Sequence, residues 1–118
     1  MLTRHHTSHR LSRCVEYSLS GTMVVTAGEV ADDLSADIIG QTRDVLTKID
    51  GLLADAGTDK NNLVAAYIWL PSISDFDAMN AVWDKWLPEG KAPVRACVEA
   101  RLANPAIRVE IQVYALKP

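Results

Sequence analysis

The clearest pattern in the chain is a helical periodicity over residues 38–53. Apolar side chains recur there at intervals of three and four residues, with polar side chains between them: Ile38, Ile39, Val45, Leu46, Ile49, Leu52 and Leu53. This spacing predicts an amphipathic helix of about five turns. Asp32, Asp33 and Ser35 precede it and suit a helix N-terminus, because their side chains can accept hydrogen bonds from the free backbone amides of the first turn. The helix is therefore expected to begin near Ser35 and to stop at Gly57.

A strand and a second helix are predicted next. Residues 63–70 are apolar on both alternating faces and end at Pro71, which is typical of a central strand. Helices are expected to cover one of its faces, and another subunit is a candidate cover for the other. Ser74 and Asp77 resemble a capping box with Asp in place of Glu. The helix after it has an apolar stripe consisting of Phe76, Met79, Val82, Trp83, Trp86 and Leu87. The spacing of the two tryptophans favours core packing over a stacking platform.

Four further runs alternate like strands. Residues 13–19 and 22–27 are predicted to form a hairpin through Ser20-Gly21, and the last two strands are predicted over 93–102 and 107–116. The apolar positions of the last two strands, such as Val94 and Val109, are expected to face the helices. Arg95 and Glu110 are then expected together on the other face of the sheet, either open to water or closed by another chain.

An arginine and a carboxylate placed together suggest binding chemistry. The guanidinium is a planar fork of donors that matches a carboxylate, and Glu110 would supply an acid/base group beside it. The alternative is a solvated sheet face or a cross-strand ion pair. Spacing alone leaves both interpretations open.

Composition narrows the class of protein. The 118 residues, 48% hydrophobic and 23% charged, fit one domain, predicted over residues 13–118 after a flexible N-terminal segment at 1–12. A net charge of -3 makes nucleic acid an unlikely partner. All three histidines lie in the first ten residues, and the two cysteines, Cys14 and Cys97, have no metal-ligand spacing, so no metal site is expected. The sequence indicates a cytoplasmic protein without a membrane segment or signal peptide.

Three stretches resemble the RidA/YjgF family, which also carries the label L-PSP endoribonuclease. They are Gly21-Thr22-Met23-Val24-Val25-Thr26-Ala27-Gly28, Pro93-Val94-Arg95-Ala96-Cys97-Val98-Glu99 and Arg108-Val109-Glu110-Ile111-Gln112-Val113-Tyr114-Ala115. The resemblance implies an α+β, chorismate-mutase-like fold of order β-β-α-β-α-β-β, with two helices on one face of a mixed sheet. It also implies a homotrimer with clefts between subunits, and hydrolysis of enamines and 2-imino acids to 2-oxo acids and ammonia without a cofactor.

The resemblance assigns roles by position. Arg95 matches a carboxylate-binding arginine, and Glu110 matches a glutamate that handles the attacking water or a transferred proton. Cys97 matches a cysteine whose backbone amide faces the ligand, Gly28 a glycine on the second strand, and Asn80 an asparagine on the second helix near the cleft. With Arg95 and Cys14, these residues are the substrate-binding candidates. Cys14 stands where many members have an aromatic residue, so the pocket wall differs. Cys97 is expected to be a packing group rather than a nucleophile, because no histidine is available to activate it.

The sequence leaves two other functions open. One is a regulator that binds 2-oxo acids through Arg95 without turning them over. The other is an L-PSP-type endoribonuclease or translation inhibitor, which the acidic balance of the chain disfavours.

Overall fold

The computed structural model describes residues 2–118 and contains six strands, two α-helices and two short 3-10 helices. In chain order these are β1 (Leu2–Thr7), β2 (Ser12–Tyr17), β3 (Thr22–Val25), α1 (Ile38–Asp55), η1 (Lys60–Asn62), β4 (Leu63–Leu70), η2 (Ile73–Asp75), α2 (Phe76–Trp86), β5 (Val94–Glu99) and β6 (Glu110–Lys117). The predicted order β-β-α-β-α-β-β is therefore extended by one strand at the N-terminus.

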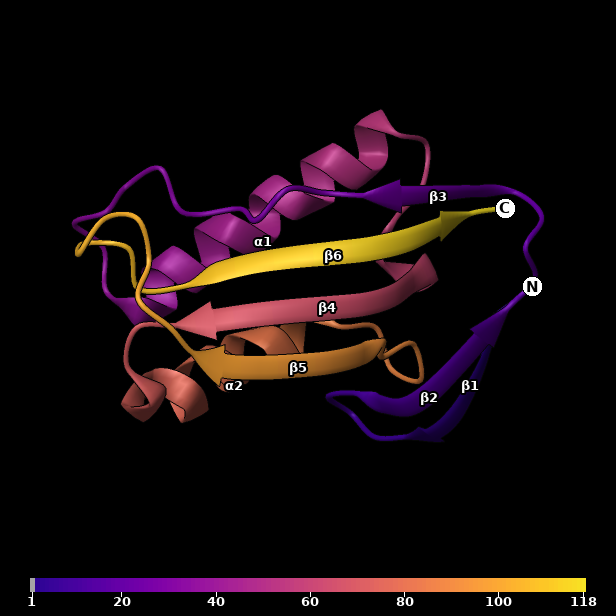
Figure 1. The fold of residues 1–118 in the computed structure, drawn as a ribbon, viewed down its shortest axis with the longest axis horizontal. Coiled ribbons are helices and arrows are strands. Elements are labelled where there is room, and N and C mark those ends of the chain that lie inside the picture. The colour runs from indigo at the N-terminus through magenta and orange to yellow at the C-terminus, as the bar shows by residue number, and fades with distance from the viewer. Residues whose placement is uncertain (1) are drawn as a thin grey trace.

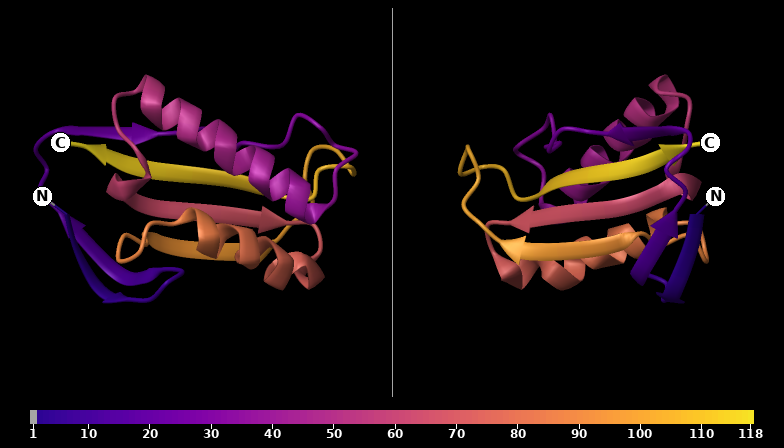
Figure 2. Two further views of the ribbon diagram at one scale, coloured as in Figure 1. Left: turned by 180° about the vertical axis from the view of Figure 1, so that it is seen from behind. Right: turned by 45° about the vertical axis from the view of Figure 1, so that its right-hand side comes forward.

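The main sheet has four strands in the order β3-β6-β4-β5. β4 and β5 run parallel, whereas β6 is antiparallel to both β3 and β4. Both α-helices lie on the same face of this sheet (Figures 1 and 2). The chain thus has the predicted α+β, chorismate-mutase-like architecture: a mixed sheet with two helices on one face.

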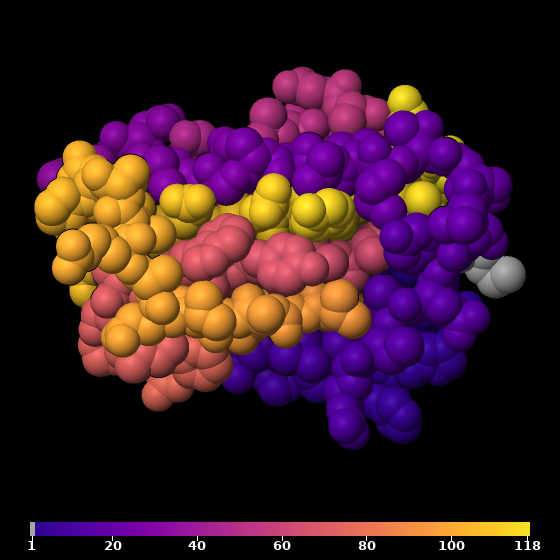
Figure 3. Space-filling view, in the orientation of Figure 1, coloured from indigo at the N-terminus to yellow at the C-terminus, as the bar shows by residue number. Residues whose placement is uncertain are grey.

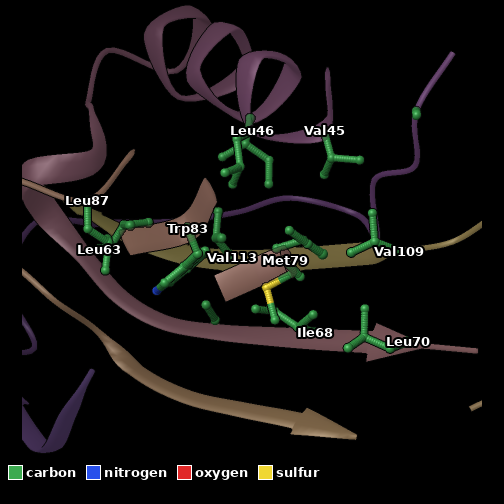
Figure 4. Packing of buried hydrophobic residues seen from close by; sticks show 14 of the residues in the cluster. Val45, Leu46, Leu63, Ile68, Leu70, Met79, Trp83, Leu87, Val109 and Val113 are labelled. Carbon is green, nitrogen blue, oxygen red and sulfur yellow. The ribbon is translucent and has the colours of Figure 1, made fainter. Parts of the chain in front are cut away.

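The core fills the space between the helices and the sheet. Val45 and Leu46 of α1 point toward Ile68 and Leu70 of β4, while Trp83 of α2 lies between them and is fully buried (Figure 4). β4 occupies the predicted residues 63–70, and its alternate side chains Ala66, Ile68 and Leu70 belong to this core. Burial of these side chains fixes which face of β4 meets the helices, and the neighbouring strands follow from its register.

Helix α1 begins at Ile38, three residues later than expected. Asp37 is its N-cap, with the side-chain Oδ1 accepting from the Gly40 amide at 2.8 Å, whereas Ser35 is bonded to Asp33. At the other end Gly57 has φ +85°, and the amides of Gly57 and Thr58 donate to Ala54 and Leu53. This is a Schellman motif, so the predicted stop at Gly57 is confirmed.

The predicted hairpin of residues 13–19 with 22–27 is wrong. β2 pairs with β1 in a separate two-stranded sheet, and β3 pairs with β6. Residues 2–7, predicted to be flexible, form β1 because that strand also buries an apolar side chain: Leu2 packs with Val15 against a small cluster of the main sheet. The residues that follow Leu2 in β1 are polar, so the sequence shows no alternation of apolar and polar residues that would predict this strand.

The predicted capping box at Ser74 is also wrong. Ser74 lies within η2, and its hydroxyl is 2.6 Å from the hydroxyl of Ser72. The N-cap of α2 is Asp75, which makes no side-chain capping bond; its carboxylate instead accepts from Arg108 Nη2 at 3.0 Å. The 3-10 turn that precedes α2 moves Ser74 away from the free amides.

The hairpin β1-β2 is fastened to the rest of the fold at its turn and at the start of β2. The Ser12 hydroxyl donates to the Ala92 carbonyl at 2.6 Å, and the Ser12 amide donates to the Pro93 carbonyl. Arg10 forms two hydrogen bonds to the Asp84 carboxylate on α2, and its carbonyl accepts from Trp83 Nε1 at 3.0 Å. The hairpin therefore lies beside the edge of the main sheet formed by β5 (Figures 1 and 2).

Candidate functional site

The register of β5 against β4 decides the direction of Arg95. Ala66 pairs with Arg95 and Ile68 pairs with Cys97 in the parallel ladder, and residues paired in this way lie on the same face of a sheet. Ala66 and Ile68 belong to the core beneath the helices. Arg95 and Cys97 consequently face α2, on the helical side of the sheet.

Arg95 lies in a half-buried setting formed by three side chains of α2. Its Nη1 donates to Oδ1 of Asn80 at 2.7 Å. The guanidinium carbon lies 5.4 Å from the ring centroid of Trp83 and 5.9 Å from that of Phe76, which is cation–π range. Burial lowers the pKa of Arg95 below its usual value, yet an arginine remains charged under ordinary conditions. We call Arg95, Asn80, Phe76, Trp83 and Cys97 the Arg95 cluster.

Asn80 offers one further hydrogen bond in this cluster. Its side chain is 1% exposed, and within residues 2–118 its Nδ2 has no hydrogen-bond partner. An unpaired buried amide donor is costly, so it marks a position where a ligand acceptor would be favourable. One carboxylate could therefore accept hydrogen bonds from both the charged guanidinium of Arg95 and the neutral amide of Asn80.

Cys97 is a partly buried packing residue. It lies against the core cluster, and burial raises the pKa of its thiol, with Arg95 acting in the opposite direction. A raised thiol pKa reduces the thiolate fraction at neutral pH, which is unfavourable for a nucleophile. This agrees with the packing role expected from the sequence.

Gly28 and Glu110 form a second group of candidates. A Cβ atom at Gly28 would overlap the Glu110 carboxylate and approach its Cδ within 2.9 Å, so the carboxylate rests against the bare backbone of this glycine. The next residue, Glu29, pairs with Ile111 through backbone bonds of 2.8 and 3.1 Å, which fixes the two segments together. Side chains larger than hydrogen at position 28 would displace the carboxylate. We call these two residues the Glu110 pair.

Arg95 and Glu110 lie on opposite faces of the sheet within one chain. Glu110 pairs with Trp69 of β4, whose side chain points away from the helices, whereas Arg95 pairs with Ala66, which points toward them. The prediction that both residues share the outer face is therefore wrong. That prediction assumed that Val94, Ala96 and Val98 face the core. In the structure β5 is an edge strand, α2 accommodates Arg95, and Val98 is 50% exposed on the outer face.

The other candidates are divided between these groups. Asn80 and Cys97 join Arg95, and Gly28 joins Glu110. Cys14 belongs to neither group: it lies exposed on β2, opposite His5 of β1. Sequence reasoning overlooked Phe76 and Trp83 as partners of Arg95, although their positions four residues before and three after Asn80 place them on the same helical face.

Among residues 2–118, no three or more His, Cys, Asp or Glu side chains are grouped so as to hold a metal ion. Neither helix in the same residues is long and apolar enough to cross a bilayer.

Comparison with known proteins places the chain in a family. Residues 2–117 match the family model described as Endoribonuclease L-PSP. A RutC family protein of Haemophilus ducreyi is 40% identical over 115 residues, which is 98% of this chain and 96% of that protein. The chain belongs to the RidA/YjgF family.

Solved structures of RidA/YjgF relatives agree with this assignment. A member of the YjgF protein family from Neisseria meningitidis is 39% identical, with a TM-score of 0.80 over 100% of this chain and 96% of that chain. An uncharacterized protein from Pseudomonas aeruginosa is 40% identical, with a TM-score of 0.81 over the whole of both chains. The matched region includes both the Arg95 cluster and the Glu110 pair.

Proposed function

We propose that this protein hydrolyses 2-imino acids and their enamine tautomers to 2-oxo acids and ammonia. The observation that carries the proposal is the Arg95 cluster, in which a half-buried guanidinium lies beside the unpaired Nδ2 of Asn80. A fixed cation and a free amide donor at one point suit a small carboxylate. Family membership supports the choice of imine chemistry over other reactions of small acids.

The reaction needs orientation and proton transfer. Arg95 and Asn80 bind the substrate carboxylate and so fix the carbon of the protonated C=N bond. A water molecule adds to that carbon while Glu110 accepts a proton from the water, and the product of this addition is a carbinolamine. Glu110 then returns this proton to the nitrogen, and the C–N bond breaks with its electron pair leaving on ammonia. A lone pair of the hydroxyl oxygen forms the C=O bond, and the hydroxyl proton passes to the ammonia. The products are the 2-oxo acid and ammonium, and Glu110 is again a carboxylate.

A second copy of the chain completes the proposed site. Within one chain the sheet separates the Arg95 cluster from the Glu110 pair, so one substrate meets both only where two copies adjoin. The outer face of the sheet supports such an association, because it exposes large apolar side chains: Met23, Val25, Tyr67 and Val98 are 37–52% exposed. Figure 3 shows this face, with β4, β5 and β6 open across its middle. The assembly proposed from the family resemblance is a homotrimer with three such clefts.

The deaminase proposal is tested with freshly generated 2-iminopropanoate. An amino-acid oxidase releases the imine from alanine in the presence of semicarbazide, which competes with the protein for it. The protein is expected to lower semicarbazone formation further as its concentration rises, and Arg95→Gln to reduce this effect by about ten- to a hundredfold. Arg101→Gln is the matched control, since Arg101 is exposed and outside the cluster. Equal activity in wild type and Arg95→Gln would refute the proposal.

Co-expression of two inactive variants tests the shared site. Random assembly of equal amounts of Arg95→Gln and Glu110→Gln chains into trimers regenerates about a quarter of all clefts with both native residues, if each cleft takes its arginine and glutamate from different copies. Restored activity in the co-expressed protein, absent from either variant alone, is the expected result. Persistent inactivity of a mixed trimer would contradict a site shared between copies.

A regulator that only binds 2-oxo acids is the second candidate. The observation favouring it is that the carboxylate-binding cluster is complete without Glu110. Binding of 2-oxobutanoate that is lost in Arg95→Gln, without any acceleration of imine hydrolysis, would favour this function. RNA cleavage that survives both Arg95→Gln and Glu110→Gln would instead support the activity in the family's description.

A further inference from the structure

A groove of about 410 Å³ lies between α1 and α2, and none of its lining residues belongs to the Arg95 cluster or the Glu110 pair. Side chains from one side of each helix line it: Ile39, Arg43, Leu46 and Thr47 from α1, and Ala81, Val82, Lys85 and Trp86 from α2. The volume falls in the lower part of the range of about 300–1,000 Å³ typical of small-molecule sites. The groove is thus large enough for an organic acid but small for a protein segment.

The floor and one wall of the groove are apolar and held in place. Leu46 is buried, Val82 is half-buried, and Ile39 exposes 37% of its surface. Trp86 is fixed from two directions: its Nε1 donates to the Asp50 carboxylate at 3.1 Å, and Lys60 Nζ lies 5.1 Å from its ring centroid. Because the indole of Trp86 is already held in place, it loses little conformational entropy when a ligand binds.

Two cations flank this apolar surface. Arg43 and Lys85 come from opposite helices, and within residues 2–118 neither has a carboxylate at ion-pair distance. The sequence explains this, because positions three and four residues from Arg43 are Ile39, Gly40, Leu46 and Thr47, and those around Lys85 are Ala81, Val82, Pro88 and Glu89. Only Glu89, beyond the end of α2, is acidic. Two uncompensated positive charges above an apolar floor complement an anion with an apolar body.

We propose that the α1–α2 groove binds a small carboxylic acid with an aromatic or branched apolar body. The carboxylate lies between Arg43 and Lys85, and the apolar body lies against Trp86, Val82 and Ile39. This site is independent of the deaminase proposal: Asn80 and Trp83 contact Arg95 from α2, whereas Ala81, Val82, Lys85 and Trp86 of the same helix line the groove.

Titration of the full-length protein with 3-phenylpropanoate tests the site. The readout is the Nε1–H resonance of Trp86 in ¹H–¹⁵N spectra, assigned with Trp86→Phe. The resonance is expected to shift in a saturable way, and the double variant Arg43→Gln/Lys85→Gln is expected to weaken binding by about ten- to a hundredfold. Neutral 3-phenylpropanamide is expected to bind correspondingly less tightly than the acid.

Three variants make the result decisive. Arg13→Gln/Lys91→Gln also removes two exposed cations, and Arg95→Gln removes the other anion-binding group; both are expected to bind 3-phenylpropanoate like wild type. Arg43→Lys/Lys85→Arg keeps the charges and is expected to retain binding, which separates charge loss from misfolding. Unchanged binding in Arg43→Gln/Lys85→Gln, or loss of binding in Arg95→Gln, would overturn the proposal. So would tighter binding of an acidic, aromatic-containing peptide than of the small acid.

Discussion

Asn80 on α2 accepts a 2.7 Å hydrogen bond from Arg95 on β5, and its own Nδ2 has no partner within residues 2–118. This pairing links the edge strand to the helix above it. It fixes the guanidinium with one oxygen and leaves an amide donor beside the charge. The pair therefore serves two purposes in the proposed function: it orients the arginine and adds a second donor for the substrate.

Substitution of Asn80 separates these two contributions. Asn80→Ala removes both the acceptor for Arg95 and the free donor, so affinity for 2-oxobutanoate is expected to fall by about tenfold or more. Asn80→Asp keeps an acceptor for Arg95 but adds a negative charge beside it, so binding is expected to fall as well while the fold is retained. Isothermal titration calorimetry measures both affinities. Unimpaired binding by Asn80→Asp would exclude a role for the net charge of the cluster.

Gly28→Ala is expected to lower the turnover of imine without a comparable loss of substrate affinity. The added methyl group would occupy the position of the Glu110 carboxylate, and that carboxylate must move. The kcat and KM values for imine hydrolysis measure the effect. A normal kcat in Gly28→Ala would argue against Glu110 as the group that handles the proton.

Gly51→Ala is the matched glycine substitution, and it is expected to stabilise the fold. Gly51 lies inside α1, where an added Cβ would meet no atom within 4 Å. Alanine there is expected to raise the free energy of unfolding by about 0.5–1 kcal/mol and to leave imine hydrolysis unchanged. Urea denaturation measures the first effect. A destabilised Gly51→Ala would show that glycine substitutions in this chain cannot be compared in this way.

The Arg10–Asp84 pair predicts a dependence of stability on acidity. The hydrogen bond from Arg10 is the main cause that holds the pKa of Asp84 below its usual value. A carboxyl whose pKa is lower in the folded state stabilises the fold above its unfolded pKa, and this contribution is lost as pH falls through the folded pKa. The difference in melting temperature between wild type and Asp84→Asn is therefore expected to be constant near neutrality and to shrink below about pH 4. Asp55→Asn serves as an exposed control.

Thiol chemistry distinguishes the two cysteines. Cys14 is exposed, whereas burial raises the pKa of Cys97, so iodoacetamide is expected to modify Cys14 first at pH 7. Arg95 lowers the pKa of Cys97, and Arg95→Gln is therefore expected to slow modification of Cys97 further. Mass spectrometry of the wild type, Cys14→Ser and Arg95→Gln follows each site. Faster labelling of Cys97 than of Cys14 would contradict the burial described here.

The sequence pattern was sufficient where an element depends on its own local sequence. β4 occupies the predicted residues, and the predicted Gly57 stops α1 two residues after its end at Asp55, because an apolar run and a Schellman motif each depend on local sequence. β1 was missed because Leu2 packs against Val64 and Leu116, which are distant in sequence and leave no local apolar pattern around β1. The capping role of Ser74 was wrong because the 3-10 turn before α2 competes for that residue.

The candidate residues were named from the sequence, but their arrangement was not. Alternation in β5 shows that Arg95 and Val94 lie on opposite faces, and it does not show which face meets the helices. The register with Ala66 settles that question, and the acceptor on Asn80 together with the rings of Phe76 and Trp83 explains why an arginine is accommodated there. Edge strands carry mixed patterns of this kind, so their inward face depends on the helix packed above them.

The placement of Arg95 and Glu110 on opposite sides of one sheet has a kinetic consequence under the proposed function. A solitary chain holds two incomplete halves, so specific activity should rise with protein concentration and level off once every chain is associated. Dilution would then switch the reaction off without any inhibitor, and reconcentration would restore it.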